Sequence, residues 1–312
     1  MDTETDIFKQ FQTVNIGMSG GRRAPHKPLL LLWAIARCLR DEQRLVPYEV
    51  VDEELAELMR LFGPHGRPLN THYPFWRLQN DGVWELDRPE LVRTTNRGDP
   101  LKEDLREYRI SGGLTNSIYE FLQNNPLSAS HISESLVAEH FPLSIFVEVF
   151  EAVRYPQSVP HIEESEFSVK WSVYRRRARD SSFRASVLSA YESTCAVCEL
   201  AIRFQESGQP LAIDAAHVKW HGYDGPSDVD NGLALCVLHH RLFDTGAFTV
   251  LPNLTVQVSP KVEGDGLDQA LGQYDSKCLR VLPNNECLRP NPKFLLWHGQ
   301  EVFKSPQLLD SM

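Results

Sequence analysis

The stretch that decides the fold is NGLALCVLHHRLFD, residues 231–244, which places a cysteine, two adjacent histidines and an aspartate close together. Its second half predicts an α-helix, in which neighbouring side chains point about 100° apart. Cys236 and His239 are three positions apart and share one face, whereas His240 and Asp244 are four apart and share another. One short helix can therefore present ligands to two different metal ions.

A second pair of candidate ligands lies upstream, in CAVC at 195–198. Two C-x-x-[CH] pairs separated by a few dozen residues are typical of a closed, tetrahedral zinc site. The other three cysteines are scattered, and six cysteines in a chain of this kind do not indicate a disulfide framework. We therefore predict a structural Zn²⁺ that stabilises folding without taking part in chemistry, held by Cys195, Cys198, Cys236 and His239.

The residues between the two pairs carry a second pattern. LAIDAAHV predicts a β-strand that ends at His217, YDGPSD predicts a turn-rich loop, and Asn231 precedes the helix. The order His217, Asn231, His240 inside a zinc-bearing hairpin and helix resembles the HNH nucleases, which have the ββα-metal fold. AAHV, DNGLALCVLHHRLFD and the preceding helix FRASVLSAYESTCAVC carry the resemblance.

This resemblance implies a role for each residue in phosphodiester hydrolysis. His217 is expected to be the general base that activates water, and Asn231 to orient the hairpin and the base. His240 is expected to bind a catalytic Mg²⁺ or Mn²⁺, which acts as a Lewis acid on the phosphate. Asp244, one helical turn further on, can reach the same ion.

One position departs from the family. HNH nucleases often have a metal ligand immediately before the base histidine, and here that position is Ala216. Asp214 is the nearest acid, but it lies three residues before His217, and residues three apart on a strand point to opposite faces. A twist or bulge would be needed for Asp214 to serve as the first-strand ligand.

The first half of the chain carries a different resemblance. RRAPHKPLLLLWAI, NTHYPFWRL and YRISGG resemble the sulfur-binding domain of phosphorothioate-dependent, McrA-like restriction endonucleases, over most of residues 8–155. Such proteins recognise DNA in which sulfur replaces a non-bridging phosphate oxygen. Sulfur is larger and less strongly hydrated than oxygen, so a small apolar pocket with nearby cations could select it.

The candidate DNA contacts follow from that picture. Tyr73 and Pro74 would form an apolar wall, while Phe75 and Trp76 are expected in the core if this segment is a strand. Gly112 and Gly113 would permit close backbone approach. Hydrogen-bond donors would come from Arg22, Arg23, His26, Lys27, Arg77 and Arg109.

The expected fold class is α+β, with a helix-rich mixed N-terminal reader domain (1–155), a polar linker (156–169) and a C-terminal ββα-metal HNH domain (170–312). The reader should contain two short strands, VWELD and LVRTT. Its predicted helices are KPLLLLWAIARCLRDEQR, EELAELMRLFG, TNSIYEFLQNN and ISESLVAEHF.

Composition narrows the class of protein. With 42% hydrophobic residues, no long apolar run and an acidic N-terminus unlike a signal peptide, a globular cytoplasmic protein is expected. The net charge of −10 argues against a uniformly basic DNA-binding surface. Locally basic segments, GGRRAPHK (20–27) and VYRRRARDSSFR (173–184), are the expected contacts with the phosphate backbone.

Together these features predict a modification-dependent, type IV-like restriction endonuclease for double-stranded phosphorothioated DNA. Two alternatives remain at this stage: an HNH endonuclease specific for methylated or hydroxymethylated cytosine, and a DNA-binding regulator with an inactive HNH fold. A restriction enzyme must cut both strands and one HNH centre cuts one, so a homodimer is expected.

Overall fold

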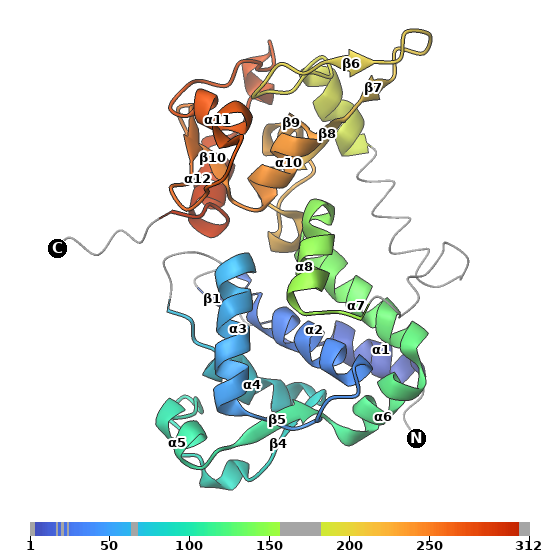
Figure 1. The fold of residues 1–312 in the computed structure, drawn as a ribbon, viewed down its shortest axis with the longest axis vertical. Coiled ribbons are helices and arrows are strands. Elements are labelled where there is room, and N and C mark those ends of the chain that lie inside the picture. The colour runs from blue at the N-terminus through green and yellow to red at the C-terminus, as the bar shows by residue number, and fades with distance from the viewer. Residues whose placement is uncertain are drawn as a thin grey trace, which may run out of the picture. The chain divides into compact units, whose positions relative to one another are not determined.

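The computed structural model describes residues 4–16, 18–19, 22–23, 25–63, 68–156 and 182–305, and Figure 1 draws the fold. The chain divides into two compact units. The first comprises Met1–Gly63, Pro68–His140 and Phe146–Ser165, and the second comprises Pro64–Arg67, Phe141–Ile145 and Glu166–Met312. Of the predicted linker only Pro156 is described, and residues 173–181 of the basic segment 173–184 also lie outside the described residues.

Helix α2 (His26–Leu39) is the centre of the first unit. Ten of the eleven side chains from Pro28 to Cys38 are buried. The helix is therefore apolar on every face and has to pack against other elements on all sides. These partners are α3 (Tyr48–Phe62), α4 (His72–Arg77), α6 (Asn116–Asn124) and α7 (Pro126–His140). Helix α1 (Glu4–Gln12) packs on α7, as does α8 (Phe146–Ala152).

A small antiparallel sheet completes this unit. Its order is β3–β5–β4, formed by Val46–Pro47, Ser111–Leu114 and Trp84–Leu86. A two-stranded ribbon, β1 (Met18–Ser19) with β2 (Arg22–Arg23), precedes α2. The remaining elements are η1 (Leu78–Asp81), η2 (Pro89–Leu91), α5 (Lys102–Glu107) and η3 (Leu143–Ile145), the last of which belongs to the second unit.

The four predicted helices and the strand VWELD are confirmed, but two local predictions are wrong. LVRTT (91–95) is not a strand: Leu91 is the last residue of η2, and Thr94 makes only an isolated bridge to Pro100. YPFW lies in helix α4, because Pro74 falls in the first helical turn, where its missing N–H has no intrahelical partner to lose. Phe75 is nevertheless fully buried, against Tyr48 and Trp84, and Trp76 is half-buried.

The second unit is built on a β-hairpin and a helix. Strand β8 (Ile213–His217) pairs antiparallel with β9 (Gly232–Cys236), and α10 (Val237–Asp244) follows directly. The predicted strand end at His217 is confirmed, and a helix at 182–190 packs on the hairpin through Phe183 and Val187. The short elements η4 (His221–Tyr223) and η5 (Val229–Asn231) lie in the hairpin loop.

The rest of the second unit surrounds this ββα core (Figure 1). It contains two hairpins, β6 (Ile202–Arg203) with β7 (Pro210–Leu211) and β10 (Phe248–Val250) with β11 (Val256–Val258). Helices α11 (Leu267–Ala270) and α12 (Pro292–Glu301) and the turns η6 (Gly272–Tyr274) and η7 (Glu286–Leu288) complete it. The predicted α+β class, with a helix-rich first part and a ββα second part, is confirmed.

In the C-terminal segment NPKFLLWHGQEVF, Trp297, Val302 and Phe303 are buried. His298 is fully buried, its Nε2 lies 3.1 Å from the carbonyl oxygen of Phe243 and its Nδ1 lies 2.8 Å from the hydroxyl of Thr249. A carbonyl can only accept, so Nε2 of His298 carries a proton. None of the described helices combines the length and the apolar character needed to cross a bilayer.

Candidate metal centres and catalytic pocket

The structure brings the four predicted zinc ligands together: one ligand atom from each of Cys195, Cys198, Cys236 and His239 lies within 4.8 Å of every other. His239 Nδ1 is 3.1 Å from Cys236 Sγ and 3.7 Å from Cys195 Sγ, and the Sγ atoms of Cys198 and Cys236 are 3.9 Å apart. Ligands about 2.3 Å from a tetrahedral ion are separated by about 3.8 Å. The donor set and its spacing therefore fit zinc.

The surroundings orient this cluster. His239 Nε2 lies 2.9 Å from the carbonyl oxygen of Ala270, so that nitrogen carries the proton and Nδ1 keeps its lone pair for an ion. Cys236 is the N-cap of α10, where the helix dipole favours a thiolate. Hydrogen bonds from Cys195 and Cys198 hold the pKa of Cys236 well below the usual thiol range.

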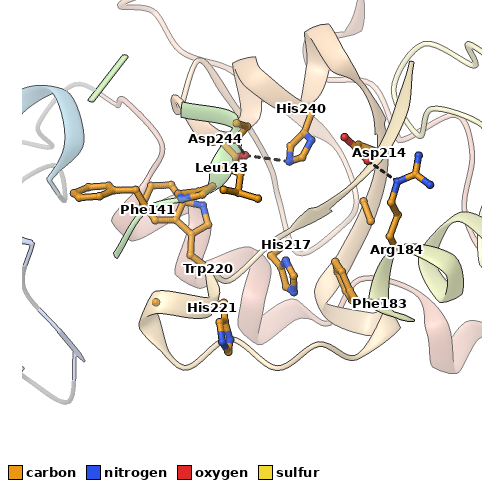
Figure 2. A pocket seen from close by; sticks show the side chains of 14 residues that line it. Phe141, Leu143, Phe183, Arg184, Asp214, His217, Trp220, His221, His240 and Asp244 are labelled. Atoms are coloured by element: carbon orange, nitrogen blue, oxygen red, sulfur yellow. Dashed lines mark hydrogen bonds and ion pairs between the residues drawn. The ribbon is translucent and has the colours of Figure 1, made fainter. Parts of the chain in front are cut away.

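A second site lies in a cavity of about 450 Å³ within the second unit. Figure 2 shows side chains that line it, among them His217 from β8 and His240 from α10. Strand β8, helix α10, the helix 182–190, the hairpin loop and the segment before η3 all contribute. The residues that the argument uses are Ser144, Phe183, Arg184, Asp214, His217, His240 and Asp244.

His240 and Asp244, the two candidate ligands on α10, form an ion pair. His240 Nε2 is 3.1 Å from Asp244 Oδ2, close to the spacing of about 3.0 Å expected for adjacent ligands on an octahedral ion with bonds of about 2.1 Å. Burial opposes the charged imidazole, but the charge and hydrogen bond of Asp244 outweigh it and raise the pKa of His240. Ser144 Oγ also donates to Asp244 Oδ2, so this oxygen is held from two sides.

His217 lies at the end of β8, half-buried beside the same cavity. The ring of Phe183 stacks on its imidazole with centroids 3.8 Å apart and planes 15° from parallel. Ser227 Oγ lies 3.5 Å from His217 Nε2. The imidazole is thus fixed on one face by an aromatic ring, and its edge remains beside the cavity.

Asn231 is fully buried and acts on the loop between the hairpin strands. Its side-chain oxygen accepts from Lys219 N at 2.8 Å, and its amide nitrogen donates to the carbonyls of Lys219 and Pro226 at 3.0 and 2.7 Å. Its own carbonyl accepts from Val218 N, the residue after His217. Asn231 therefore closes the loop and fixes where the strand that carries His217 ends.

Asp214 lines the same cavity as His217, against strict strand alternation, while Ala216 is buried. Asp214 Oδ1 accepts from Arg184 Nε at 2.7 Å, and Arg184 also donates to the carbonyl of Ile213 at 2.8 Å. Both side chains of the pair are nearly half exposed. The carboxylate of Asp214 thus forms an ion pair with Arg184, and Figure 2 shows this pair beside His240.

Sequence reasoning missed several residues of this cavity. Arg184 belongs to the basic segment that the sequence singled out, but nothing local marks Phe183, Ser144 or Ser227. Ser144 is 100 positions from its partner Asp244, and a phenylalanine on a helix is ordinary core material. A weak signal for Phe183 exists in Gly232, whose missing side chain leaves room opposite His217.

In the first unit, the structure places Tyr73 and Arg77 together on α4. The Arg77 guanidinium lies 4.8 Å from the centre of the Tyr73 ring, and Arg77 Nε donates to Asp99 at 3.0 Å. The Asp99 pairing joins α4 to the tight turn Thr95–Asp99, on which Arg97 is exposed. Pro74, between the two predicted contacts, is buried and faces the domain interior.

The other predicted DNA-contacting residues of the first unit do not lie on α4. Lys27 Nζ donates to the carbonyl of Asn15 at 2.7 Å and pairs with Asp81, with little of either charged side chain exposed. His26 begins α2, half-buried. Arg109 is exposed in a turn with φ +48°. Arg22 and Arg23 form β2, and their side chains lie outside the described part of the structure.

Gly112 and Gly113 are buried in the central strand β5. A Cβ on Gly112 would lie 2.7–2.9 Å from Leu86, Trp84 and Phe75, and one on Gly113 would lie 2.0 Å from the carbonyl oxygen of Arg44. Their missing side chains serve the packing of this domain itself. The approach of Gly112 and Gly113 to DNA stays a prediction, and the structure shows that both glycines are needed for packing.

Two family models match the chain: one described as ScoMcrA-like, DNA sulfur-binding domain matches residues 4–157, and one described as HNH endonuclease matches residues 195–251. Among curated proteins, none matches the chain.

The chain is also similar to several solved structures. The sulfur binding domain of ScoMcrA complexed with phosphorothioated DNA is 28% identical, with 47% of this chain and 96% of that chain covered and a TM-score of 0.42. The type IV phosphorothioation-dependent restriction endonuclease ScoMcrA is 26% identical over 54% of this chain and 38% of that chain, with a TM-score of 0.42. The corresponding domain of SprMcrA is 23% identical, covering 49% and 95%, at the same TM-score.

Proposed function

Because this chain combines a ScoMcrA-like DNA sulfur-binding domain with an HNH endonuclease domain, we propose that it is a modification-dependent, type IV-like restriction endonuclease. The N-terminal domain, proposed at 1–155, would recognise phosphorothioated DNA, and the HNH domain, proposed at 170–312, would hydrolyse it. One observation carries the hydrolytic part: His217 faces the same cavity as the ligand pair His240 and Asp244.

The proposed chemistry uses the cavity residues in separate roles. His217 takes the proton of the attacking water, and Asn231 holds the loop that places His217 at the strand end. His240 and Asp244 hold Mg²⁺ or Mn²⁺, which when bound stabilises negative charge on the phosphate. Arg184, partly exposed at the cavity rim, binds a phosphate oxygen once DNA competes with Asp214 for its guanidinium.

The Cys₃His cluster is proposed to hold a structural zinc ion. The first pair belongs to the turn at 195–198 and the second to the start of α10, so the ion would link the two segments. Its place at the N-terminus of the helix that carries His240 and Asp244 would fix that helix against the hairpin. The zinc would therefore support the catalytic pair without touching DNA.

The proposed sulfur site is centred on Tyr73 and Arg77. An aromatic ring covered by a guanidinium offers an apolar surface for sulfur and a cation for the phosphate. Arg22, Arg23, His26 and Arg109 remain proposed DNA contacts, whereas Lys27 is paired with Asp81 and would act mainly on packing. The buried Pro74 would support Tyr73 from within α4.

The decisive experiment uses three kinds of duplex of identical sequence: phosphorothioated duplexes, methylated duplexes with 5-methylcytosine or hydroxymethylcytosine, and unmodified duplexes. Each is incubated with the full chain and Mg²⁺ or Mn²⁺. Cleavage of the phosphorothioated duplex alone is the expected result. Selective cleavage of the methylated duplexes would replace the proposed specificity with base-modification reading, and equal cleavage of all three would remove selectivity.

The inactive-regulator alternative has its own outcome in the same experiment. Tight binding of the phosphorothioated duplex without cleavage under any divalent ion would favour it. His217→Ala provides the matched control, because it should bind DNA like the wild-type protein and fail to cut.

We also propose that the active form is a homodimer, since one HNH centre cuts one strand. Light scattering with and without a phosphorothioated duplex tests this. A monomeric mass under both conditions, together with double-strand cleavage, would contradict it.

A further inference from the structure

The imidazole of His217 and the ring of Phe183 form a close stack, 3.8 Å between centroids and 15° between planes. Phe183 is 3% exposed and lies at the start of the helix 182–190. A stack this close to parallel fixes the plane of the imidazole, which a backbone strand alone leaves free to rotate about its side-chain bonds.

Gly232 makes room for this stack. In the antiparallel register of the hairpin, Gly232 is the direct partner of His217. A Cβ at Gly232 would lie 2.5 Å from Val187 Cγ2 and 3.0 Å from Phe183 Cζ. The φ of Gly232 is −126°, a value that any residue can adopt, so its missing side chain serves space and not backbone strain. Phe183 thus occupies the place that a cross-strand side chain would fill.

The helix 182–190 holds Phe183 there. Val187, one turn along, is fully buried on the same hairpin, and Leu188 and Tyr191 extend the contact into the core of the second unit. The ring is therefore delivered by a helix outside the hairpin and outside the segment 195–251 that the HNH model matches.

We propose that Phe183 is the positioning residue for His217, and that Gly232 supplies the slot in which its ring stacks. This assignment rests on the proposed nuclease function for the role of His217. Phe183 covers one face of the imidazole and Ser227 lies at its Nε2 edge, and His217 lines the same cavity as His240. Proton abstraction requires a fixed direction, because small displacements of a base cost large factors in rate.

The stack itself can be measured without activity. In protein labelled at histidine, the ring current of Phe183 should shift the carbon-bound protons of His217 upfield, and His217→Gln identifies its signals among the 11 histidines. Phe183→Leu removes the ring and keeps apolar volume, so these signals should move downfield. Gly232→Ala keeps the ring but displaces it, and should move the same signals.

Cleavage of the phosphorothioated duplex then tests the consequence. In single-turnover reactions, Phe183→Leu and Gly232→Ala should each lose about tenfold or more in rate, while the DNA concentration for half-maximal rate and the Mn²⁺ affinity stay within about twofold. Phe294→Leu is the matched control, a buried phenylalanine of the same core on α12 that should keep the wild-type rate.

Three results would overturn the assignment. They are unshifted His217 signals in the wild-type protein, a folded Phe183→Leu protein that cuts at the wild-type rate, and an equal loss of rate in Phe294→Leu. If Phe183→Leu fails to fold, the His217 signals and the cleavage rate of Gly232→Ala test the assignment without it. If the wild-type protein shows the shifted His217 signals but cuts no duplex, the proposed nuclease function is refuted. The stack would then exist without a role in catalysis.

Discussion

At the scale of single residues, the two adjacent histidines of α10 have separate surroundings. His239 Nδ1 lies among three sulfurs, with its Nε2 fixed by the carbonyl of Ala270. His240 points to Asp244 and the catalytic cavity instead. Side chains one residue apart on a helix cannot share a face, so His239 lies in the Cys₃His cluster and His240 in the cavity.

Replacing each of these two histidines separately with alanine should therefore give two different phenotypes. His239→Ala should lose bound zinc and lower the unfolding temperature, because a structural site needs all four ligands. His240→Ala should keep zinc and the wild-type unfolding temperature but cut about 100-fold more slowly or worse. Metal analysis, thermal unfolding and cleavage rates on both variants check this. A loss of zinc from His240→Ala would mean that His240 also binds the zinc ion, and would contradict the assignment of two separate metal sites.

Asp244 is a second residue-scale case, because Ser144 donates to the same oxygen that faces His240. Ser144→Ala removes one hydrogen bond and leaves Oδ2 free for an ion. We expect Mn²⁺ affinity to rise, by a factor of about 3 to 10, since the ion no longer competes with a neutral hydrogen bond worth about 1 kcal/mol. Calorimetric titration with Mn²⁺ measures this, and an unchanged or weaker affinity would show that Ser144 helps to orient the ligand.

At the scale of elements, α10 is held by a partner at each end. Its N-terminus carries two of the candidate zinc ligands, and near its C-terminus the ring of Phe243 stacks on His298 of α12 at 3.6 Å. His298 also bridges Phe243 and Thr249 through its two ring nitrogens. The catalytic pair thus lies on a helix whose position is set by two other elements.

This packing should make the stability of the second unit depend on pH. Burial lowers the pKa of His298 to about 4, below its ordinary value of 6.5. The unfolded chain therefore binds a proton first, so the contribution is fully present above pH 6.5 and is lost as pH falls toward 4. At pH 5 the loss is roughly 2 kcal/mol, at about 1.4 kcal/mol per pH unit.

Denaturant unfolding at pH 7.5 and pH 5 measures the effect. His298→Gln cannot titrate in this range, so its stability should fall less between the two pH values than that of the wild-type protein. All other groups are common to both proteins and cancel in the difference. Equal pH dependence in the two proteins would mean that folding does not shift the pKa of His298.

At the scale of the whole molecule, two domains divide the proposed work between recognition and cutting. Tyr73 and Arg77 are the candidate DNA contacts of the sulfur-binding domain. They contact each other and do not line the cavity of the HNH domain. A net charge of −10 means that binding must come from local patches, since the chain as a whole repels DNA.

Tyr73→Ala in the full chain should accordingly reduce selectivity without damaging the nuclease. Binding of the phosphorothioated duplex should weaken by about 10-fold or more, while binding of the unmodified duplex changes little, because the ring contributes apolar contact and no charge. Competition binding with the two duplexes measures the ratio. A uniform loss for both duplexes would instead place Tyr73 in the domain core or on a plain phosphate contact.

The sequence by itself predicted the Cys and His residues that cluster in the fold and the ββα element order, because these depend on spacings of three and four residues that a helix or strand converts directly into shared faces. It also located the two domains through their motifs. It failed where local periodicity was ambiguous: YPFW became helix α4, and LVRTT became a turn.

Only the tertiary structure decided which residues surround those ligands. Phe183 meets His217 across 34 positions, Ser144 meets Asp244 across 100, and Lys27 is neutralised by Asp81 across 54. Nothing local specifies such contacts, since they follow from how buried faces of separate elements pack at close density. Gly232 illustrates the division: its place in the motif is visible in the sequence, but the ring that fills its space is visible only in the fold.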